Sequence, residues 1–401
     1  MTPAQKDFLT VLGASLHGAH LSPEPLAQTL PEILADAVRQ HLLPLLAETV
    51  PEAFGGGTGD LSPYRQLAIH QATLQAQRSL DFRALYRDLR RAGLRPIVVK
   101  GELCSRLYPY PYHRISVDND LFLPVEEFPA CHRVLLAHGL HAEVPEDRLS
   151  SEDEITYRDS EGRFYIEFHR ALFDTSPQAP DNLNSFFSDV FENAVEMDGF
   201  LSMPPQSHLL YLLLHAYKHF IYSGVGIRQT CDIGLWAQYY APEIDWAWLL
   251  DSCRSIHGER FAAAQFRIAE EFLGLSLPLP ALWRSIDTDP EPMLADLFSG
   301  GVFGAESLTR LHTATATLNA IRRSRNGSGP GTLASVFPSL AYMERQYPYL
   351  RTRPVLLPAA WLSRIFHYLR EVRQEDSSSA SGSLRLAKER IALLKQYGIL
   401  S

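Results

Sequence analysis

The sequence has few cysteines and no long apolar run. Its four cysteines, Cys104, Cys131, Cys231 and Cys253, are widely spaced and form no CxxC pair, which argues against a zinc ribbon and a disulfide framework. Nowhere do about 18 uncharged apolar residues follow one another, and the chain does not begin with a basic segment and an apolar core. We therefore expect reduced thiols, no membrane attachment and a cytoplasmic location.

Positive charge is also in short supply. With 37 Lys and Arg against 46 Asp and Glu, the net charge is -9, so no global positive field attracts nucleic acid or anionic lipid. The 46% hydrophobic and 21% charged residues are typical of a globular protein. A length of 401 residues exceeds one ordinary core and predicts two or three substructures. Nothing in the sequence indicates the oligomeric state.

Motifs of several enzyme classes are missing. The chain has no GxSxG nucleophile elbow. Gly55 to Gly57 are followed by no Lys-Ser/Thr and preceded by no strand, so they indicate a flexible connection and not a phosphate loop. His215 and His219 share one helix face, but Ala216 stands where a zinc protease needs glutamate. These histidines are interpreted as core or capping residues, or as groups that face a nucleotide.

The pattern of apolar residues divides the chain into three parts. Residues 1–93 and 204–401 have the periodicity of helices, with RNGSGPGT and EDSSSASGS as linkers in the second region. Between them, in residues 94–203, the run IVV, the run SVDNDLFLP and two segments around a DSEG turn predict strands. The order strand, helix, strand predicts a βαβ unit, and the hairpin makes the sheet mixed. We therefore predict an α+β fold.

Two carboxylates open the second predicted strand. Asp118 and Asp120 are two residues apart, so both side chains project to one face, while Asn119 projects to the other. Adjacent like charges raise each other's pKa, and a divalent cation is the usual partner for such a pair. Mg²⁺ prefers oxygen ligands and binds carboxylates together with phosphate oxygens. A lone Asp-x-Asp is common in surface turns, so the interpretation depends on its surroundings.

The surroundings favour a site for metal and phosphate. In the hairpin strand FYIEFH, Glu167 and His169 lie on the face opposite the phenylalanines. If this strand lies beside the Asp strand, three carboxylates converge and can hold two metal ions. Lys100 and Gly101 precede a predicted helix, whose N-terminus offers backbone N–H groups and a positive dipole end to phosphate.

These residues resemble a known family. The stretch VVKGELCSRLYPYPYHRISVDNDLFLP carries Lys-Gly, Tyr-Pro, Arg and Asp-x-Asp as in uncharacterised nucleotidyltransferases of the DNA polymerase β-like superfamily. The likeness continues through IEFHRALF, HAYKHF and RQTCDIGLW and covers about residues 85 to 240. The matching residues are Lys100, Gly101, Tyr108, Pro109, Arg114, Asp118, Asp120, Glu167, His169, His215, Lys218, His219, Arg228 and Asp232.

The resemblance implies a polymerase β-like core and Mg²⁺-dependent use of an NTP such as ATP, with Asp118 and Asp120 as metal ligands. It also favours contact of Lys218 with phosphate. Two residues depart from the pattern: Glu102 replaces the serine of Gly-Ser, and Asn119 replaces an apolar residue and needs a hydrogen-bond partner.

The spacing of Arg228 and Asp232 leaves two interpretations open. Their i, i+4 positions predict either a helical ion pair or a phosphate-binding arginine that the aspartate orients. Arg114, just ahead of the Asp strand, is better placed to bind phosphate.

We therefore expect an enzyme that uses two Mg²⁺ ions to transfer a nucleoside monophosphate to a hydroxyl of a small molecule or protein. Glu167 would be a third metal ligand or the base for the acceptor. The alternatives are a non-catalytic nucleotide- or effector-binding protein on the same fold, suggested by Glu102 and Asn119, and an interaction scaffold.

Overall fold

The structure is a computed structural model that describes residues 1–51, 61–175, 182–222, 224–300, 356–361 and 389–400, with the single residues 347 and 353. The glycine-rich connection at 55–57 and the two predicted linkers, 325–332 and 375–383, lie outside the described residues. The chain divides into two compact units, Met1–Tyr217 with Val225–Val302, and Lys218–Gly224 with Phe303–Ser401.

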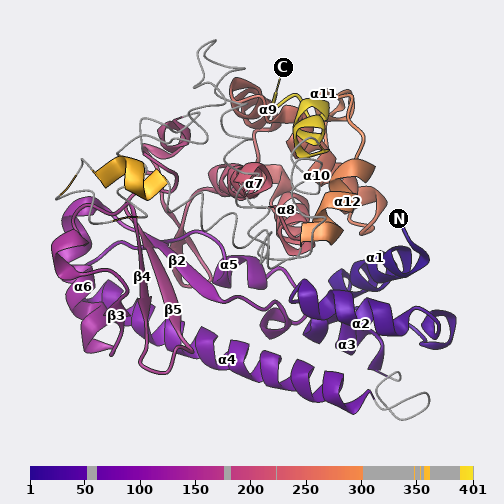
Figure 1. Ribbon diagram of the computed structural model, residues 1–401, viewed down its shortest axis with the longest axis horizontal. Helices are drawn as coiled ribbons and strands as arrows, with labels where there is room; N and C mark the ends of the chain where they lie inside the picture. The colour runs from indigo at the N-terminus through magenta and orange to yellow at the C-terminus, as the bar shows by residue number, and fades with distance from the viewer. Residues whose placement is uncertain are drawn as a thin grey trace. The chain divides into compact units, whose positions relative to one another are not determined.

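A single mixed sheet is the centre of the first unit (Figure 1). Among the described residues, seven strands run in the order β3-β4-β5-β2-β1-β7-β6. Strands β2 and β5 are parallel, as are β1 and β7, and the other neighbours are antiparallel. The predicted α+β class is confirmed. The strands are β1 (Ile97–Val98), β2 (Asp118–Phe122), β3 (His141–Ala142), β4 (Glu154–Arg158), β5 (Tyr165–His169), β6 (Val195–Met197) and β7 (Phe200–Ser202).

The predicted βαβ unit is wrong, because β1 and β2 pair antiparallel, with Ile97 opposite Phe122 and Val98 opposite Leu121. The intervening helix α5 (Glu102–Ser105) has only four residues, too short for the crossover helix that parallel neighbours require. The end of β1 and the start of β2 therefore lie at the same end of the sheet. This arrangement brings the residue after Val99 close to the start of β2.

The predicted hairpin of β4 and β5 is confirmed, with Tyr157 opposite Ile166. Its turn is closed by Asp159, whose Oδ1 accepts hydrogen bonds from the backbone N–H groups of Arg163 (2.8 Å) and Phe164 (3.2 Å). Alternation along β5 buries Ile166 and Phe168 completely. The polar residues of β5 therefore lie on the opposite face of the sheet.

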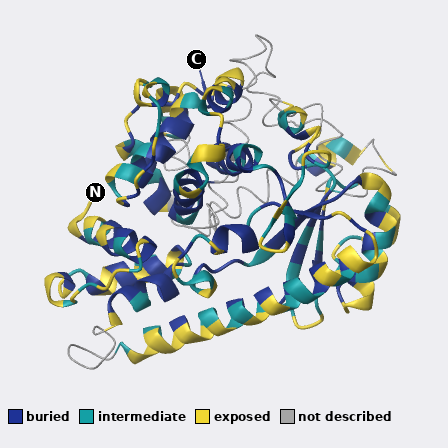
Figure 2. Cartoon of the chain, turned by 180° about the vertical axis from the view of Figure 1, so that it is seen from behind, coloured by how far each residue is buried: buried dark blue, intermediate teal, exposed yellow. Residues whose placement is uncertain are grey.

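Two helices cover the apolar face of the sheet. Helix α4 (Ser62–Arg91) buries Phe82 and Tyr86 against Phe200 of β7, with ring centroids 5.6 and 4.8 Å apart. Helix α6 (Phe128–Ala137) packs Phe128 on Phe168 at 4.9 Å. Figure 2 shows the outer side of α4 exposed and the side toward the sheet buried. The hydrophobic residues thus anchor the strands from one side and leave the other side for polar groups.

The remaining helices come before the first strand and after the last strand of the sheet along the chain, as predicted. The N-terminal helices are α1 (Pro3–Leu16), α2 (Leu30–Arg39) and α3 (Leu43–Thr49). Helix α7 (Pro205–Tyr222) begins directly after β7, and its first part covers the polar face of the sheet. The others are α8 (Ile227–Tyr239), α9 (Trp246–Ser255), α10 (Glu259–Glu271), α11 (Ala281–Arg284) and α12 (Glu291–Gly300).

The second unit is described only in part. Residues 357–361 and 389–396 are helical. In this unit the ring of Phe220 contacts Tyr397 edge to face at 5.8 Å, and the guanidinium of Arg390 lies 4.5 Å from the same ring. Ala360 is fully buried against Tyr347, Leu357 and Trp361.

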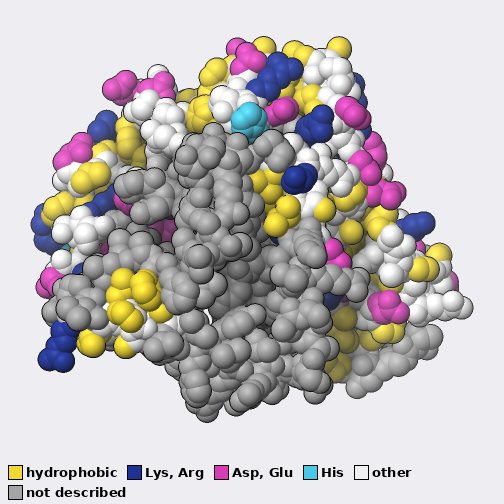
Figure 3. All heavy atoms as spheres, turned by 45° about the horizontal axis from the view of Figure 1, so that its top comes forward, with side chains coloured by type: hydrophobic (Ala, Val, Ile, Leu, Met, Phe, Trp, Pro, Cys, Tyr) yellow, Lys and Arg dark blue, Asp and Glu magenta, His cyan; other side chains and the backbone are white. Residues whose placement is uncertain are grey.

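The described residues contain no membrane-spanning helix, and one face of the molecule shows Lys and Arg side chains mixed with acidic ones. No helix in the described ranges combines the length and the hydrophobicity needed to cross a bilayer. On the face drawn in Figure 3, the coloured Lys and Arg side chains are interspersed with Asp and Glu. This distribution agrees with the scarcity of positive charge in the sequence.

Acid should destabilise the fold through His208 on α7. Its ring is fully buried, stacks on Trp236 at 4.0 Å and lies 3.0 Å from the Ser202 hydroxyl. Burial lowers the pKa of His208 to about 3, so the unfolded chain binds this proton first as the pH falls below about 6.5. Between pH 7 and pH 5, urea unfolding should show that the wild type loses about 2 kcal/mol more than His208→Gln. Equal losses in both proteins would contradict this assignment.

Candidate active site

The parallel register of β2 and β5 brings carboxylates together on the polar face of the sheet. Asp120 pairs with Glu167, and Asp118 pairs with Tyr165 one step earlier. Side chains of paired residues in neighbouring strands project to the same face, so Asp118, Asp120 and Glu167 share one. The pairing on which the predicted convergence depended is therefore confirmed. Asp120 is 1% exposed, whereas Asp118 and Glu167 are partly exposed.

Lys100 lies among these carboxylates because β1 and β2 are antiparallel. Its Nζ is 3.3 Å from Asp118 Oδ2 and 3.1 Å from Asp120 Oδ1. It is also 3.4 Å from Nε2 of His215 on α7. Burial opposes the charge on Lys100, but the Asp118 and Asp120 carboxylates outweigh it and raise the pKa of Lys100 well above its usual value. Lys100 is thus a partly buried cation, with its side chain 16% exposed, held by both aspartates.

His169 completes the cluster from the end of β5. Its Nε2 is 3.0 Å from Asp120 Oδ1 and 3.9 Å from Glu167 Oε2, and its ring is 5% exposed. Burial by itself would raise the pKa of Asp120, but Lys100 and the hydrogen bond with His169 lower it below its ordinary value. Asp120 is therefore ionised and shares one oxygen between two partners.

Glu167 differs sharply from its neighbour. Burial raises the pKa of Glu167 to about 9, with further contributions from the charges of Asp120 and Asp118. Two carboxylates in contact with pKa values on opposite sides of neutrality are common in catalytic sites. The carboxyl of Glu167 therefore keeps a proton much more readily than that of Asp120.

The donor set suits a divalent metal ion. Asp120, Glu167 and His169 each offer an atom, and these atoms lie within 4.8 Å of one another. Asp120 Oδ2 is buried and has no hydrogen-bond partner, and an orphaned buried carboxylate oxygen is unfavourable unless a cation meets it. Oxygen ligands with one imidazole are compatible with Mg²⁺ or Mn²⁺. Asp118 stands outside this group of three and is held by Lys100.

The loop after Lys100 differs from the predicted phosphate helix. Helix α5 ends at Ser105, so it has too few aligned peptide units for a strong dipole at its N-terminus. Gly101 adopts φ +47°, and a Cβ there would lie 3.6 Å from Asn119 Oδ1 and from the Asp118 carbonyl. Glycine allows this left-handed conformation without strain. Asn119 is buried at 6% exposure beside the glycine.

Glu102 points away from the carboxylates and joins α5 to α4. It accepts hydrogen bonds from the Ser79 hydroxyl (2.8 Å) and from Nη2 of Arg83 (2.7 Å), and Arg106 lies at 3.5 Å. The glutamate that departs from the family pattern therefore has a structural role. Its side chain is bound to Ser79, Arg83 and Arg106 and not to Lys100.

Removing this carboxylate should destabilise the protein without removing a metal ligand. Glu102→Ala leaves the Ser79 hydroxyl and a partly exposed Arg83 without their partner, which should cost about 1–3 kcal/mol in urea unfolding. The matched variant Glu152→Ala removes a carboxylate from the partly exposed pair with Arg148 and should change stability by less than about 1 kcal/mol. A Glu102→Ala protein as stable as Glu152→Ala would refute the anchoring role.

Arg114 and Asp232 form a buried ion pair. The side chains are 3% and 4% exposed, and Nε and Nη2 of Arg114 donate to the two carboxylate oxygens at 2.8 and 2.6 Å. The Tyr108 hydroxyl donates to the same carboxylate at 2.8 Å. Arg114 is thus paired with Asp232 through Nε and Nη2, while its Nη1 is buried without a hydrogen-bond partner, and its contact with phosphate stays a prediction.

The predicted helical ion pair of Arg228 and Asp232 is wrong, because Asp232 pairs with Arg114. Arg228 donates instead to the Ile115 carbonyl, and its Nε is buried without a hydrogen-bond partner. Burial and the nearby Arg114 charge lower the pKa of Arg228. Two arginines with one carboxylate leave a net positive charge close to the start of β2.

Helix α7 supplies a residue that the sequence interpretation missed. Tyr211 lies one turn before His215, and the two ring centroids are 5.7 Å apart. Burial, followed by the charge of Asp120, raises the pKa of Tyr211 well above its usual value, so Tyr211 lies within electrostatic range of the carboxylates. The i, i+4 spacing to His215 was the signal that could have found it. Lys218 and His219 belong to the second unit, so their relation to this cluster stays a prediction.

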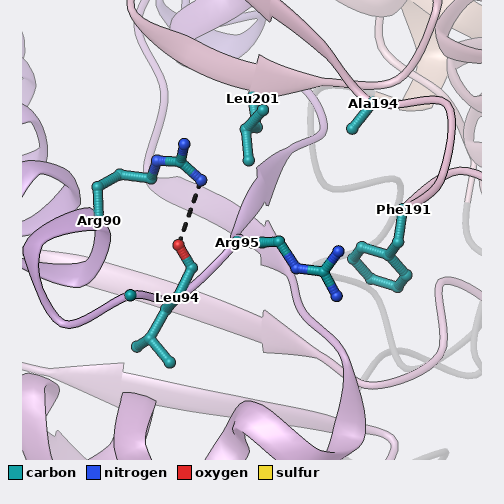
Figure 4. A pocket seen from close by; sticks show the side chains of 7 residues that line it. Arg90, Leu94, Arg95, Phe191, Ala194 and Leu201 are labelled. Atoms are coloured by element: carbon teal, nitrogen blue, oxygen red, sulfur yellow. Dashed lines mark hydrogen bonds between the residues drawn. The ribbon is translucent and has the colours of Figure 1, made fainter.

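A pocket of about 330 Å³ lies where α4 leads into β1, beyond the N-terminal end of the strand whose other end leads to Lys100. Figure 4 shows Arg90 and Arg95 beside it, with Phe191 facing Arg95. Arg90 donates to the Leu94 carbonyl at 3.2 Å and Arg95 pairs with Glu127 at 3.2 Å. None of the predicted site residues lines this pocket.

Comparison with known proteins agrees with this geometry. A family described as uncharacterised nucleotidyltransferase matches residues 27–274, more than half of the 401 residues. No curated protein and no solved structure matched the chain. The match includes every strand of the sheet and the carboxylate cluster. The chain therefore belongs to this nucleotidyltransferase family and is an enzyme of that kind.

Proposed function

We propose that the enzyme transfers a nucleoside monophosphate from an NTP to a hydroxyl group of a small molecule or protein, with Mg²⁺. The observation that carries this proposal is the pairing of Asp120 with Glu167 beside Asp118, with Lys100 among them. The family match supports nucleotidyl transfer in general. The net charge of -9 favours a small or protein acceptor over nucleic acid.

Asp118, Asp120 and Glu167 are the residues that would hold Mg²⁺, and His169 orients Asp120. When bound, the metal would neutralise charge on the triphosphate and lower the pKa of an acceptor hydroxyl. Two ions would fit the usual arrangement of phosphoryl-transfer sites.

The chain's own groups would position the reaction. Lys100 supplies a positive charge next to the carboxylates, where the phosphates would lie. The acceptor oxygen forms a bond to the α-phosphorus, and the bond from that phosphorus to the β-phosphate oxygen breaks, so pyrophosphate leaves. Glu167, whose pKa is raised by burial, would be suited to receive the proton of the hydroxyl once its own proton has been displaced, if it is not itself a ligand.

Other predicted contacts to the nucleotide are kept as part of the proposal. His215 is 3.4 Å from the Lys100 ammonium and would hold that group in place. Arg228 has a buried nitrogen without a partner and would attract the triphosphate through its charge. Lys218 and His219 follow His215 on the same helix, and their contact with the nucleotide remains part of the proposal.

The test is a search for the acceptor. Purified protein is incubated with each NTP labelled at the α-phosphate, Mg²⁺ and a cell lysate, and the labelled products are separated by size. We expect label on one small-molecule or protein fraction with Mg²⁺ and none with excess EDTA. Label that appears with EDTA, or none with any NTP and Mg²⁺, would contradict the proposal.

A further inference from the structure

The two sides of the Asp120 carboxylate are used differently. Oδ1 meets the Lys100 ammonium at 3.1 Å and His169 Nε2 at 3.0 Å, whereas Oδ2 is buried with no hydrogen-bond partner. Asp118 presents its Oδ2 to the same ammonium at 3.3 Å. The carboxylates therefore offer two cation positions, one filled by Lys100 and one among Asp120, Glu167 and His169, whose ligand atoms lie within 4.8 Å of one another.

Lys100 is a confined occupant of its position. Its side chain is 16% exposed, so solvent is a poor alternative partner. The groups that face it from other elements are the two aspartates of β2, Glu167 of β5, and Tyr211 and His215 of α7. Moving the ammonium away from the aspartates with no new anion present would leave a largely buried charge unpaired, which is strongly unfavourable.

A triphosphate changes this balance because it brings the missing anion. Its oxygens can accept charge-assisted hydrogen bonds from an ammonium group, and a metal ion that travels with the phosphates can take over the two aspartates. The exchange keeps every charge paired, whereas metal entry alone does not.

We infer that Lys100 occupies the cation position between Asp118 and Asp120 until a nucleotide binds, and that its ammonium then transfers to the triphosphate as a second metal ion enters. This inference rests on the proposed function, since it concerns the same carboxylates. It makes one metal position independent of nucleotide and the other conditional on it. Lys100 is here a positioning residue that sets the order of binding.

Metal binding by the full chain tests the inference without any acceptor. Mn²⁺ is titrated into the protein, and free Mn²⁺ is followed by its EPR signal, with and without the non-hydrolysable α,β-methylene analogues of the four NTPs. We expect one tightly bound Mn²⁺ per chain alone and two with the analogue that binds, with the second tightened roughly ten- to a hundredfold. Two equally tight Mn²⁺ ions without nucleotide would overturn the inference.

Variants separate Lys100 from a general change of charge. Lys100→Met and Lys100→Gln should bind the second Mn²⁺ without nucleotide and lose most of the nucleotide effect. The control Lys6→Met removes an exposed ammonium from α1 and should behave as the wild type does. If neither Lys100 variant folds, the wild-type titration alone decides.

Two failures can be told apart. If α-labelled nucleotide is transferred but the Lys100 variants bind Mn²⁺ as the wild type does, the inference fails and the proposed function stands. If the wild type binds no Mn²⁺ with any analogue, the metal-dependent function itself fails.

Discussion

Asp120→Asn is expected to reduce nucleotidyl transfer by roughly a thousandfold or more, which corresponds to about 4 kcal/mol of transition-state stabilisation. Asp120 joins the Lys100 side of the cluster to the Glu167 side, and its Oδ2 is the orphaned oxygen that a metal would meet. An amide of the same shape carries no charge for the metal. Asp118→Asn should cause a comparable loss.

Stability distinguishes lost chemistry from lost structure. Asparagine keeps the oxygen that meets Lys100 and His169, so the thermal melt of Asp120→Asn should stay close to that of the wild type. The control Asp147→Asn changes an exposed residue and should keep full activity. An Asp120→Asn enzyme that retains more than about a tenth of its activity would remove Asp120 from the catalytic machinery.

Asp232→Asn should destabilise the fold by about 3–5 kcal/mol, because it leaves the buried Arg114 guanidinium without its carboxylate. The pair is buried, with bonds of 2.6 and 2.8 Å, and asparagine leaves a single uncharged oxygen for Arg114 and Tyr108 together. Asp251→Asn breaks an exposed pair with Arg254 at 3.4 Å and should cost less than about 1 kcal/mol. Urea unfolding followed by tryptophan fluorescence measures both.

The double variant Arg114→Met/Asp232→Leu refines this prediction. Replacing both charges by apolar groups of similar size is often close to neutral, so the double variant should recover much of the stability that Asp232→Asn loses. A double variant as unstable as the sum of the single changes would show that the two residues do not act as a pair.

The strands of the site were predictable because their signals are local. The alternation in FYIEFH predicted that Glu167 and Phe168 lie on opposite faces of the strand, and the DSEG turn predicted the hairpin. The position of Lys100 could not be predicted, because it depends on the antiparallel pairing of β1 with β2. The order of elements along the chain does not show at which end of the sheet the next strand begins. Strand pairing thus turned a linear motif into a cluster.

The sequence also did not show which charged residues pair with one another when they are far apart along the chain. Arg228 is four residues before Asp232, but Asp232 pairs with Arg114, which is 118 residues away. Glu102, which looked like a defect in a phosphate loop, is explained by Ser79 and Arg83 on α4. In both cases a buried charge needs a partner of opposite charge, and which partner is close enough depends on tertiary packing that no short motif encodes.

The most direct measurement of the central claim follows two labels through one reaction. The enzyme is given Mg²⁺, the acceptor fraction and an NTP labelled either at the α-phosphate or at the γ-phosphate. We predict that the α-label moves to the acceptor and the γ-label leaves as pyrophosphate in equal amount, and that Asp120→Asn abolishes both. A γ-label on the acceptor, or free phosphate in place of pyrophosphate, would contradict nucleotidyl transfer at this site.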